Sequence, residues 1–408
     1  MTTAGRDEEP ATNEISWRAQ VADYLSLERN VTIASASVFL LGLGEELWKK
    51  FLPKYLEALG ASTPVIGLFG AAEIFVDAVY QYPGGWIADR LGRRSAFLIF
   101  VLLAAAGYLI YLFSPSWPFV FLGLALAMAW QSMASPAIFA IIADSLPQER
   151  RAMGFTVQSI LKRVPIVIAP MIGGAFIAEF GVVRGIHLGL VVTLFIVALT
   201  LVLVHRINIE VRAAAATNIR GVWRSFHMAM KHLLISDVII RMCEGMTGVL
   251  TILYVTNVHG LSAARYGALI AIQMATSILV YVPAGKVAGR VGRKPFVILT
   301  FICFALFPLA VVAARSFALL IVAFVIGGLR EIGEPARKAM IVDFAREDMR
   351  ARSVGLYYLI RGLSITPAAV IGGFLWKITP EVPFMIAAAI GLLGTLIFAL
   401  TVEERFAS

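Results

Sequence analysis

Two acids and two bases interrupt the first apolar stretch of the chain, in the sequence GLGEELWKKFLPKYLEALGAS at residues 42–62. The uncharged run before them is shorter than the roughly 20 residues of helix that span a bilayer core. At 100° per residue, Glu45, Glu46, Lys49 and Lys50 fall on about half of the helix circumference. Charges inside a membrane usually face a bundle interior or a water-filled cavity. We therefore expect this face to line a polar pathway, while Glu45–Lys49 and Glu46–Lys50 are also spaced for purely structural bridges.

Other apolar segments also carry charged residues, which suit a polar site between helices. The bases among them indicate that the solute has an anionic group, and the many aromatic and apolar residues allow an amphiphile. Arg330 and Glu334 are spaced to pair with each other, so structural bridges remain the alternative in that segment. The candidate substrate-binding residues are Glu45, Glu46, Lys49, Lys50, Lys162, Arg163, Glu244, Arg330, Glu334 and Arg361.

Glu73 and Asp77 differ from the other charges because they are like charges at i,i+4 with no base in their own segment. Burial and mutual repulsion both favour the protonated form of a carboxyl group. Such a group can take up and release a proton, so Glu73 and Asp77 are candidates for proton coupling, with Glu46 as a competing candidate. A base from another segment, such as Lys49 or Lys162, would hold either acid ionised and defeat this role.

The elements that position these residues are membrane helices. Of the 408 residues, 59% are hydrophobic and only 15% are charged, and the mean hydropathy is +0.83. A chain of this length with so little polar surface is an integral membrane protein. The N-terminal residues lack a basic region followed by a short apolar run, so we expect a cytoplasmic tail and no signal peptide. Twelve apolar segments are predicted, at 31–58, 64–86, 95–114, 117–143, 154–179, 185–206, 235–258, 263–286, 295–314, 317–343, 353–377 and 381–401.

Several classes of function lack the residues that they need. Five scattered histidines, with Cys243 and Cys303 inside apolar segments, form no pattern of metal ligands, disulfides or catalytic nucleophiles. The sequence has no phosphate-binding loop of an ATP-driven pump and no basic face with stacking aromatics that would bind nucleic acid. We therefore expect no enzyme activity, no cofactor, no metal and no nucleic-acid partner.

A polar stretch divides the chain into two sets of six segments. Most of the 35 Lys and Arg residues fall in the tails and in the loops on the side of the N-terminus, which places both termini in the cytoplasm. This bias largely accounts for the net charge of +9. The predicted parts are a cytoplasmic N-terminal tail, a six-helix bundle, a cytoplasmic linker, a second six-helix bundle and a C-terminal tail, at 1–30, 31–206, 207–234, 235–401 and 402–408.

The two sets of six segments repeat each other in sequence. LGASTPVIG at 59–67 aligns with HGLSAARYG at 259–267, and YPGGWIADRLGRR at 82–94 aligns with VPAGKVAGRVGRK at 282–294. One offset sustained through helices and loops is strong evidence of an internal duplication. Six helices repeated in parallel, with a solute site near the midplane between the halves, are typical of one class of secondary transporters.

The chain resembles the major facilitator superfamily over essentially its whole length. The signature loop of that family is similar to residues 85–94, and the second copy at 285–294 has Gly289 where the acid belongs. The resemblance implies a conformational latch on the cytoplasmic side, weaker in the second copy. The latch residues are Gly85, Asp89, Arg90, Gly92, Arg93, Arg94, Gly285, Arg290, Gly292, Arg293 and Lys294. APMIGG at 169–174 is similar to a motif of the family's antiporters, and close helix packing explains its small residues equally well.

We therefore interpret the chain as an all-α membrane protein with twelve transmembrane helices in two pseudo-symmetric six-helix bundles. The resemblance implies a secondary transporter that moves a small anionic or amphiphilic solute across the cytoplasmic (inner) membrane by alternating access. We expect proton coupling and favour export by antiport. An uncoupled facilitator and a non-transporting membrane receptor on the same scaffold remain the alternatives. The expected partners are the small-molecule substrate, the proton and the lipid bilayer, and we expect a monomer.

Overall fold

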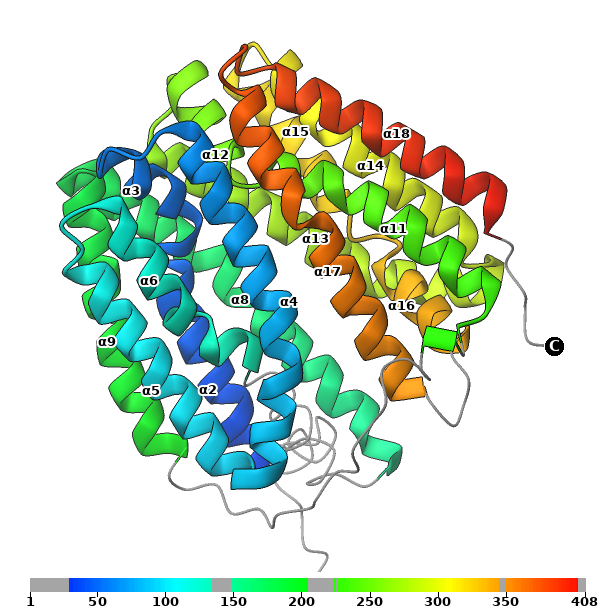
Figure 1. Cartoon of the computed structure of the whole chain (residues 1–408), viewed down its shortest axis with the longest axis horizontal. Helices are drawn as coiled ribbons and strands as arrows, with labels where there is room; N and C mark the ends of the chain where they lie inside the picture. Colours follow the sequence, from blue (N-terminus) through cyan, green and yellow to red (C-terminus); the bar gives the residue numbers. More distant parts are fainter. Residues whose placement is uncertain (1–28, 134–147, 205–222, 225, 345–349, 403–408) are drawn as a thin grey trace, which may run out of the picture.

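The computed structural model describes residues 29–133, 148–204, 223–224, 226–344 and 350–402, and every regular element in these ranges is helical. The first half contains α2 (Arg29–Glu46), α3 (Leu52–Ala58), α4 (Thr63–Leu91), α5 (Arg93–Leu112), α6 (Trp117–Ala127), α8 (Gln148–Phe180) and α9 (Val182–Val204). The second half contains α11 (Met228–Thr247), α12 (Thr251–Leu253), α13 (Ala263–Val291), α14 (Lys294–Ala313), α15 (Phe317–Leu329), α16 (Glu334–Asp343), α17 (Arg350–Leu375) and α18 (Val382–Thr401). Figure 1 shows these halves as two helical bundles side by side.

The membrane segments agree with the prediction from hydropathy. Eight of the described helices are long and apolar enough to cross a membrane, and α11 with the helical turns that follow it makes a further span, bent by 41°. Each of the twelve predicted segments contains a described helix, so the twelve-helix, all-α prediction is confirmed. The second half begins earlier than predicted. Helix α11 starts at Met228 instead of residue 235, because the His227 side chain accepts a hydrogen bond from the Ala229 amide and caps the helix.

Within the described residues, four of the twelve segments are interrupted, and they occupy corresponding places in the two halves. The first segment breaks between α2 and α3, and the seventh breaks after α11. The fourth continues from α6 into a π-helical turn, Ala129–Met133, and the tenth breaks between α15 and α16. The internal duplication therefore extends to the positions at which helices break.

The two halves are held together by two pairs of helices, α4 with α17 and α8 with α13. Glycines allow the close approach. A Cβ added at Gly67 would stand 2.5 Å from the Ala369 carbonyl oxygen, and one added at Gly267 would stand 2.2 Å from the Pro170 carbonyl oxygen. Small residues at crossings let helix backbones pack directly against each other in a membrane. Gly174, in the APMIGG stretch, serves the same contact, since its Cβ would meet the Ala263 carbonyl oxygen at 2.6 Å.

These contacts run from one end of the molecule to its middle. Gly373 packs on Thr63, at the end where the left-handed Gly60 and Gly260 make turns, and Gly362 packs on Ala78 further along the same pair. We call this end the Gly60 end. Contact is thus kept over about 22 Å of α4. In Figure 1, α4 and α17 lie close together near the top of the view and farther apart near the bottom.

The two signature loops lie at the opposite end, where Gly92 and Gly292 have positive φ angles of 82° and 116°. Both turns therefore use a backbone conformation that favours glycine. In the second copy, the Arg293 guanidinium pairs with Asp343 at the end of α16, and Lys294 Nζ donates to the Ala399 carbonyl oxygen at 2.8 Å. This loop is tied to neighbouring helices of its own half. The side-chain surroundings of Gly85, Asp89, Arg93, Gly285 and Arg290 lie outside the described part of the structure.

Candidate functional site

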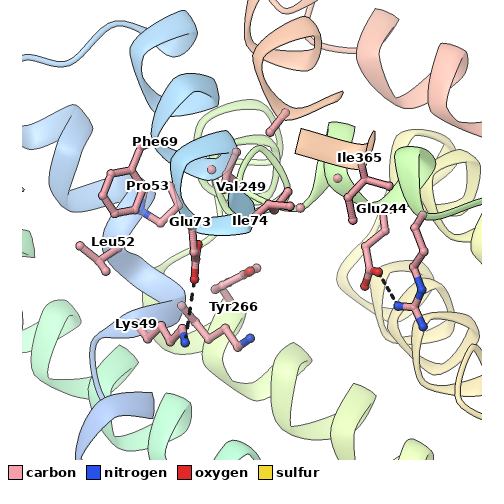
Figure 2. Close-up of a pocket in the computed structure, with 16 residues that line it drawn as sticks. Lys49, Leu52, Pro53, Phe69, Glu73, Ile74, Glu244, Val249, Tyr266 and Ile365 are labelled. Atoms are coloured by element: carbon pink, nitrogen blue, oxygen red, sulfur yellow. Dashed lines mark hydrogen bonds and ion pairs between the residues drawn. The ribbon is translucent and has the colours of Figure 1, made fainter. Parts of the chain in front are cut away.

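A cavity of about 290 Å³ lies between the two halves. The first half contributes residues from the interrupted first helix and from α4, and the second half contributes residues from α11, α13 and α17. Figure 2 shows Glu73 with Lys49 on one side of this space and Glu244 on the other. The charged residues of its wall are Lys49, Lys50, Glu73, Arg241 and Glu244, and the apolar and aromatic ones are Leu52, Pro53, Phe69, Ile74, Val249, Tyr266, Ile365 and Ala369.

The break in the first helix brings its lysines to the cavity wall. Helix α2 ends at Glu46, and residues Lys49–Phe51 form a single 3-10 turn before α3. Pro53 stands in the first turn of α3 and has no N–H to donate to a preceding carbonyl group, so it cannot continue the α2 hydrogen-bond ladder. Discontinuous helices of this kind form the solute sites of several transporter folds.

Glu45 and Lys49 form hydrogen bonds with each other and with neighbouring side chains of the first half. Lys49 Nζ lies 2.9 Å from Glu45 Oε1 and also donates to Gln131. Trp130 Nε1 donates to Glu45 Oε2 at 2.7 Å. The predicted i,i+4 pair is therefore present, and Glu45 is a buried structural anchor that positions Lys49.

Glu46 has different surroundings, although it is adjacent in sequence. Its side chain is 7% exposed, and its Oε2 atom is buried without a hydrogen-bond partner. The i,i+4 pair with Lys50 that the spacing allows is absent among the described residues, because the helix ends at Glu46 and Lys50 follows in the 3-10 turn. Lys50 likewise has no ion-pair or hydrogen-bond partner in the described part of the chain, and it lines the cavity.

Glu73 and Asp77 of α4 both have a partner. Glu73 Oε1 lies 3.9 Å from Lys49 Nζ, so a base from another helix does reach this acid. Asp77 Oδ1 accepts a hydrogen bond from the Ser132 hydroxyl at 2.6 Å. Glu73 lines the cavity, whereas Asp77 is not among its lining residues.

Charged residues of α11, the turn after α15, α16 and α17 form one continuous network. Arg241 lies 2.7 Å from Glu244 and 3.2 Å from Glu334. Arg330 Nη1 is 3.6 Å from Glu244 Oε1. The predicted pairing of Arg330 with Glu334 is not formed, because the chain breaks between α15 and α16 and Arg330 turns toward α11 instead. Glu334 lies 3.8 Å from Lys338.

Asp237 is the centre of this network and was missed by the sequence analysis. It is fully buried, 2.5 Å from Arg337 and 3.4 Å from Arg361, and it accepts a hydrogen bond from the Tyr357 hydroxyl at 2.9 Å. The available signal was an acid near the start of a membrane segment with Arg241 four residues later. Arg361 therefore serves this network, and it does not line the cavity.

Arg163 crosses from the first half to the second. It donates to the Ser277 hydroxyl at 2.8 Å and to Glu331 at 3.3 Å, and its guanidinium lies 4.3 Å from the centre of the Tyr281 ring. Its neighbour Lys162 is exposed and has no partner among the described residues. Of the ten predicted substrate-binding residues, the cavity wall contains Lys49, Lys50 and Glu244.

Two pseudo-symmetric helical bundles with a charged cavity between them are typical of one class of secondary transporters. The model of the Major Facilitator Superfamily matches residues 34–240 and matches again at 233–407. The chain belongs to the major facilitator superfamily. The two matches correspond to the two halves that the internal repeat indicates.

Similar proteins agree with this family. An uncharacterized MFS-type transporter of Methanocaldococcus jannaschii is 23% identical over 384 residues, which cover 91% of this chain and 94% of the relative. The quinolone resistance protein NorA of Staphylococcus aureus is 26% identical over 153 residues, 38% of this chain and 39% of NorA.

Solved structures show the same fold. The nucleoside transporter NupG matches with a TM-score of 0.74 and 12% identity, over 92% of this chain and 100% of NupG. A bacterial homologue of the human lysosomal transporter Spinster, in an inward-facing and unoccupied conformation, matches with a TM-score of 0.67 and 16% identity, over 94% and 99% of the two chains.

Proposed function

We propose that this protein is a proton-coupled secondary transporter that exports a small anionic or amphiphilic solute across the cytoplasmic membrane. The observation that carries the proposal is the charged cavity between the two halves, lined by Lys49, Lys50, Glu73, Arg241 and Glu244. Charged residues are costly inside a membrane and are retained where they face a solute pathway. The partial similarity to a quinolone resistance protein supports export.

The contacts between the halves support alternating access. With both termini in the cytoplasm, the Gly60 end faces outward, and the α4–α17 and α8–α13 contacts close it. A polar contact between the halves adds to this closure. Lys54 Nζ donates to Asn257 Oδ1 at 2.5 Å, and Asn257 Nδ2 donates to Glu57 Oε1 at 2.7 Å. The described state then corresponds to a carrier closed to the outside, and transport requires these contacts to separate while the opposite end closes.

Glu46 is the best-placed proton carrier of the three acids. Burying a carboxyl oxygen that no hydrogen bond reaches costs more in the charged form than in the neutral form. Glu73 and Asp77 have partners that stabilise the ionised form, Lys49 in one case and Ser132 in the other. Proton uptake and release at Glu46 would change the charge next to the break in the first helix, which is where the cavity begins.

The test begins by finding the solute. A thermal-shift screen of the purified protein against anions, sugars, drugs and lipids identifies it, because a bound solute stabilises the native state. In proteoliposomes, the wild-type protein should accumulate this solute when a pH gradient is imposed. Glu46→Gln should lose accumulation but keep solute exchange at equal pH, because a permanently neutral side chain imitates the protonated state.

The other acids give the comparison that decides the proton route. Loss of accumulation in Glu73→Gln or Asp77→Asn, with Glu46→Gln normal, would move the proton route to α4. Accumulation that survives in all three variants would identify an uncoupled facilitator. Binding without any flux would identify a receptor.

A further inference from the structure

The charges of the cavity wall leave one base without a partner. The wall contains three bases and two acids. Lys49 lies 3.9 Å from Glu73, and Arg241 lies 2.7 Å from Glu244. Lys50 is the remaining base, and no described residue accepts a hydrogen bond from it or pairs with it. The wall therefore has an excess of one positive charge, and that charge is located at Lys50.

Each acid of the wall already has a base within ion-pair distance. Glu244 is shared between Arg241 at 2.7 Å and Arg330 at 3.6 Å. Glu73 shares Lys49 with the buried Glu45, which itself accepts a hydrogen bond from Trp130. A ligand cation would have to compete with these fixed bases, whereas a ligand anion meets Lys50 without displacing any group. Hydrogen bonds to charged groups are among the stronger ones in proteins, and more so where water is displaced.

The rest of the wall is apolar and belongs to both halves. Figure 2 shows Phe69 and Ile74 of α4 near Val249 of the seventh segment, and Ile365 of α17 next to Glu244. Tyr266 adds an aromatic ring from α13. Burial of an apolar body against such a wall favours binding. The wall offers few hydrogen bonds to a sugar or another polyhydroxylated solute.

The size of the cavity suits a small apolar body. Small-molecule sites occupy about 300–1,000 Å³, and the volume of about 290 Å³ found here is at the lower end of that range. An apolar body of one or two rings is of suitable size.

The geometry points to an amphiphilic organic monoanion as the ligand, with its anionic group at Lys50 and its apolar body between Phe69, Tyr266 and Ile365. This inference rests on the proposed function, because it names the substrate class of the same cavity. It ranks polyanions below monoanions, since the wall offers a single partner-free base, and it ranks amphiphilic cations below monoanions, since each acid of the wall already has a base within 4 Å.

The test is an equilibrium binding measurement on purified protein in lipid nanodiscs, with four probes that share one body. The probes are naphthoate, its neutral amide, naphthalenedicarboxylate and naphthylmethylammonium. Naphthoate should bind most tightly to the wild-type protein. Equal affinity for naphthoate and its amide, tighter binding of the dianion or the cation, or no binding of naphthoate at millimolar concentration would each overturn the assignment. These arms need no variant, so they are independent of any folding defect.

Variants then locate the anionic group. Lys50→Gln should weaken naphthoate binding about 10- to 150-fold, as expected for a lost hydrogen bond to a charged group, and should leave amide binding nearly unchanged. Lys50→Arg should keep most of the naphthoate affinity. Lys338→Gln removes an exposed lysine that does not line the cavity, and it should match the wild type.

Lys162, which also has no ion-pair or hydrogen-bond partner among the described residues, supplies the competing site. Loss of naphthoate binding in Lys162→Gln with normal binding in Lys50→Gln would overturn the assignment to Lys50. The experiment is separate from the transport assay, because it uses no gradient. If naphthoate does not bind as expected while another solute is still transported, the assignment of a monoanion is wrong and the proposed transport function is unaffected.

Discussion

Asp237 and Arg337 place opposite charges inside the second bundle, where their side chains are 0% and 1% exposed. Breaking a buried pair by removing one partner leaves an unpaired charge, whereas replacing both with apolar groups is often nearly neutral. We therefore predict that Asp237→Ala lowers the free energy of unfolding by about 3–5 kcal/mol. The double variant Asp237→Leu with Arg337→Met should recover much of this loss. Thermal unfolding of purified protein in detergent measures both.

The control for this prediction is Glu331→Gln, which changes a partly exposed acid of the same half. It should shift the unfolding temperature far less than Asp237→Ala. If the double variant is as unstable as Asp237→Ala alone, the network is required as a whole and the pairwise account is wrong.

At the same scale, the sequence predicted some side-chain partners and missed others. The i,i+4 spacing predicted the pair of Glu45 with Lys49, and this pair forms although α2 ends at Glu46. The pairing of Arg330 with Glu334 was wrong because a helix break separates them, and a break changes the side-chain direction that the i,i+4 rule assumes. Asp237 was missed because its partners Arg337 and Arg361 come from segments distant in sequence.

At the scale of helices, Arg163 links α8 to α13 and to the turn after α15. Its guanidinium holds Ser277 and Glu331 and covers the Tyr281 ring, so this contact exists only while the two halves keep their present arrangement. We predict that Arg163→Gln shifts the conformational equilibrium away from this arrangement. A charge-assisted hydrogen bond worth about 1.5–3 kcal/mol corresponds to a change of about tenfold or more in the population ratio.

A cysteine at Val249, on the cavity wall, reports this shift. The two native cysteines are buried and can be replaced by alanine to give a clean background. A membrane-impermeant maleimide applied from outside should label the Val249→Cys reporter faster when Arg163→Gln is present. Lys338→Gln is the control. If the labelling rate is the same with and without the Arg163→Gln substitution, Arg163 does not stabilise the closed external end.

The sequence predicted which segments are helices better than it predicted where they break. Long apolar runs determine the twelve segments directly. Breaks depend on single residues, such as Pro53 in α3, and on tertiary contacts such as Gly333, where an added Cβ would stand 2.2 Å from the Phe296 carbonyl oxygen. An apolar run shows no sign of such a contact. The cavity depends on these breaks, so its lining could be predicted only in part.

At the scale of the whole molecule, two helix pairs related by the internal duplication close the same end. Gly67 meets Ala369 in one pair, and Gly267 meets Pro170 in the other. The sequence alignment of the repeats placed these two glycines at equivalent positions, but their contact with the opposite half could be seen only in three dimensions. Because the pairs lie on two sides of one pseudo-twofold axis, both must separate for the Gly60 end to open.

We predict that Gly67→Ala and Gly267→Ala each weaken closure of the Gly60 end. The added methyl groups would stand 2.5 Å and 2.2 Å from carbonyl oxygens of rigid helices, so the helices must move apart. External labelling of the Val249→Cys reporter should rise in both variants, and solute exchange in proteoliposomes should fall because the closed state is part of the transport cycle. Gly355→Ala, on α17, is the matched control, since a Cβ added at Gly355 meets no atom within 4 Å. If the two variants label and transport like Gly355→Ala, the α4–α17 and α8–α13 crossings are not the external gate, and closure must depend on the Lys54, Asn257 and Glu57 contact instead.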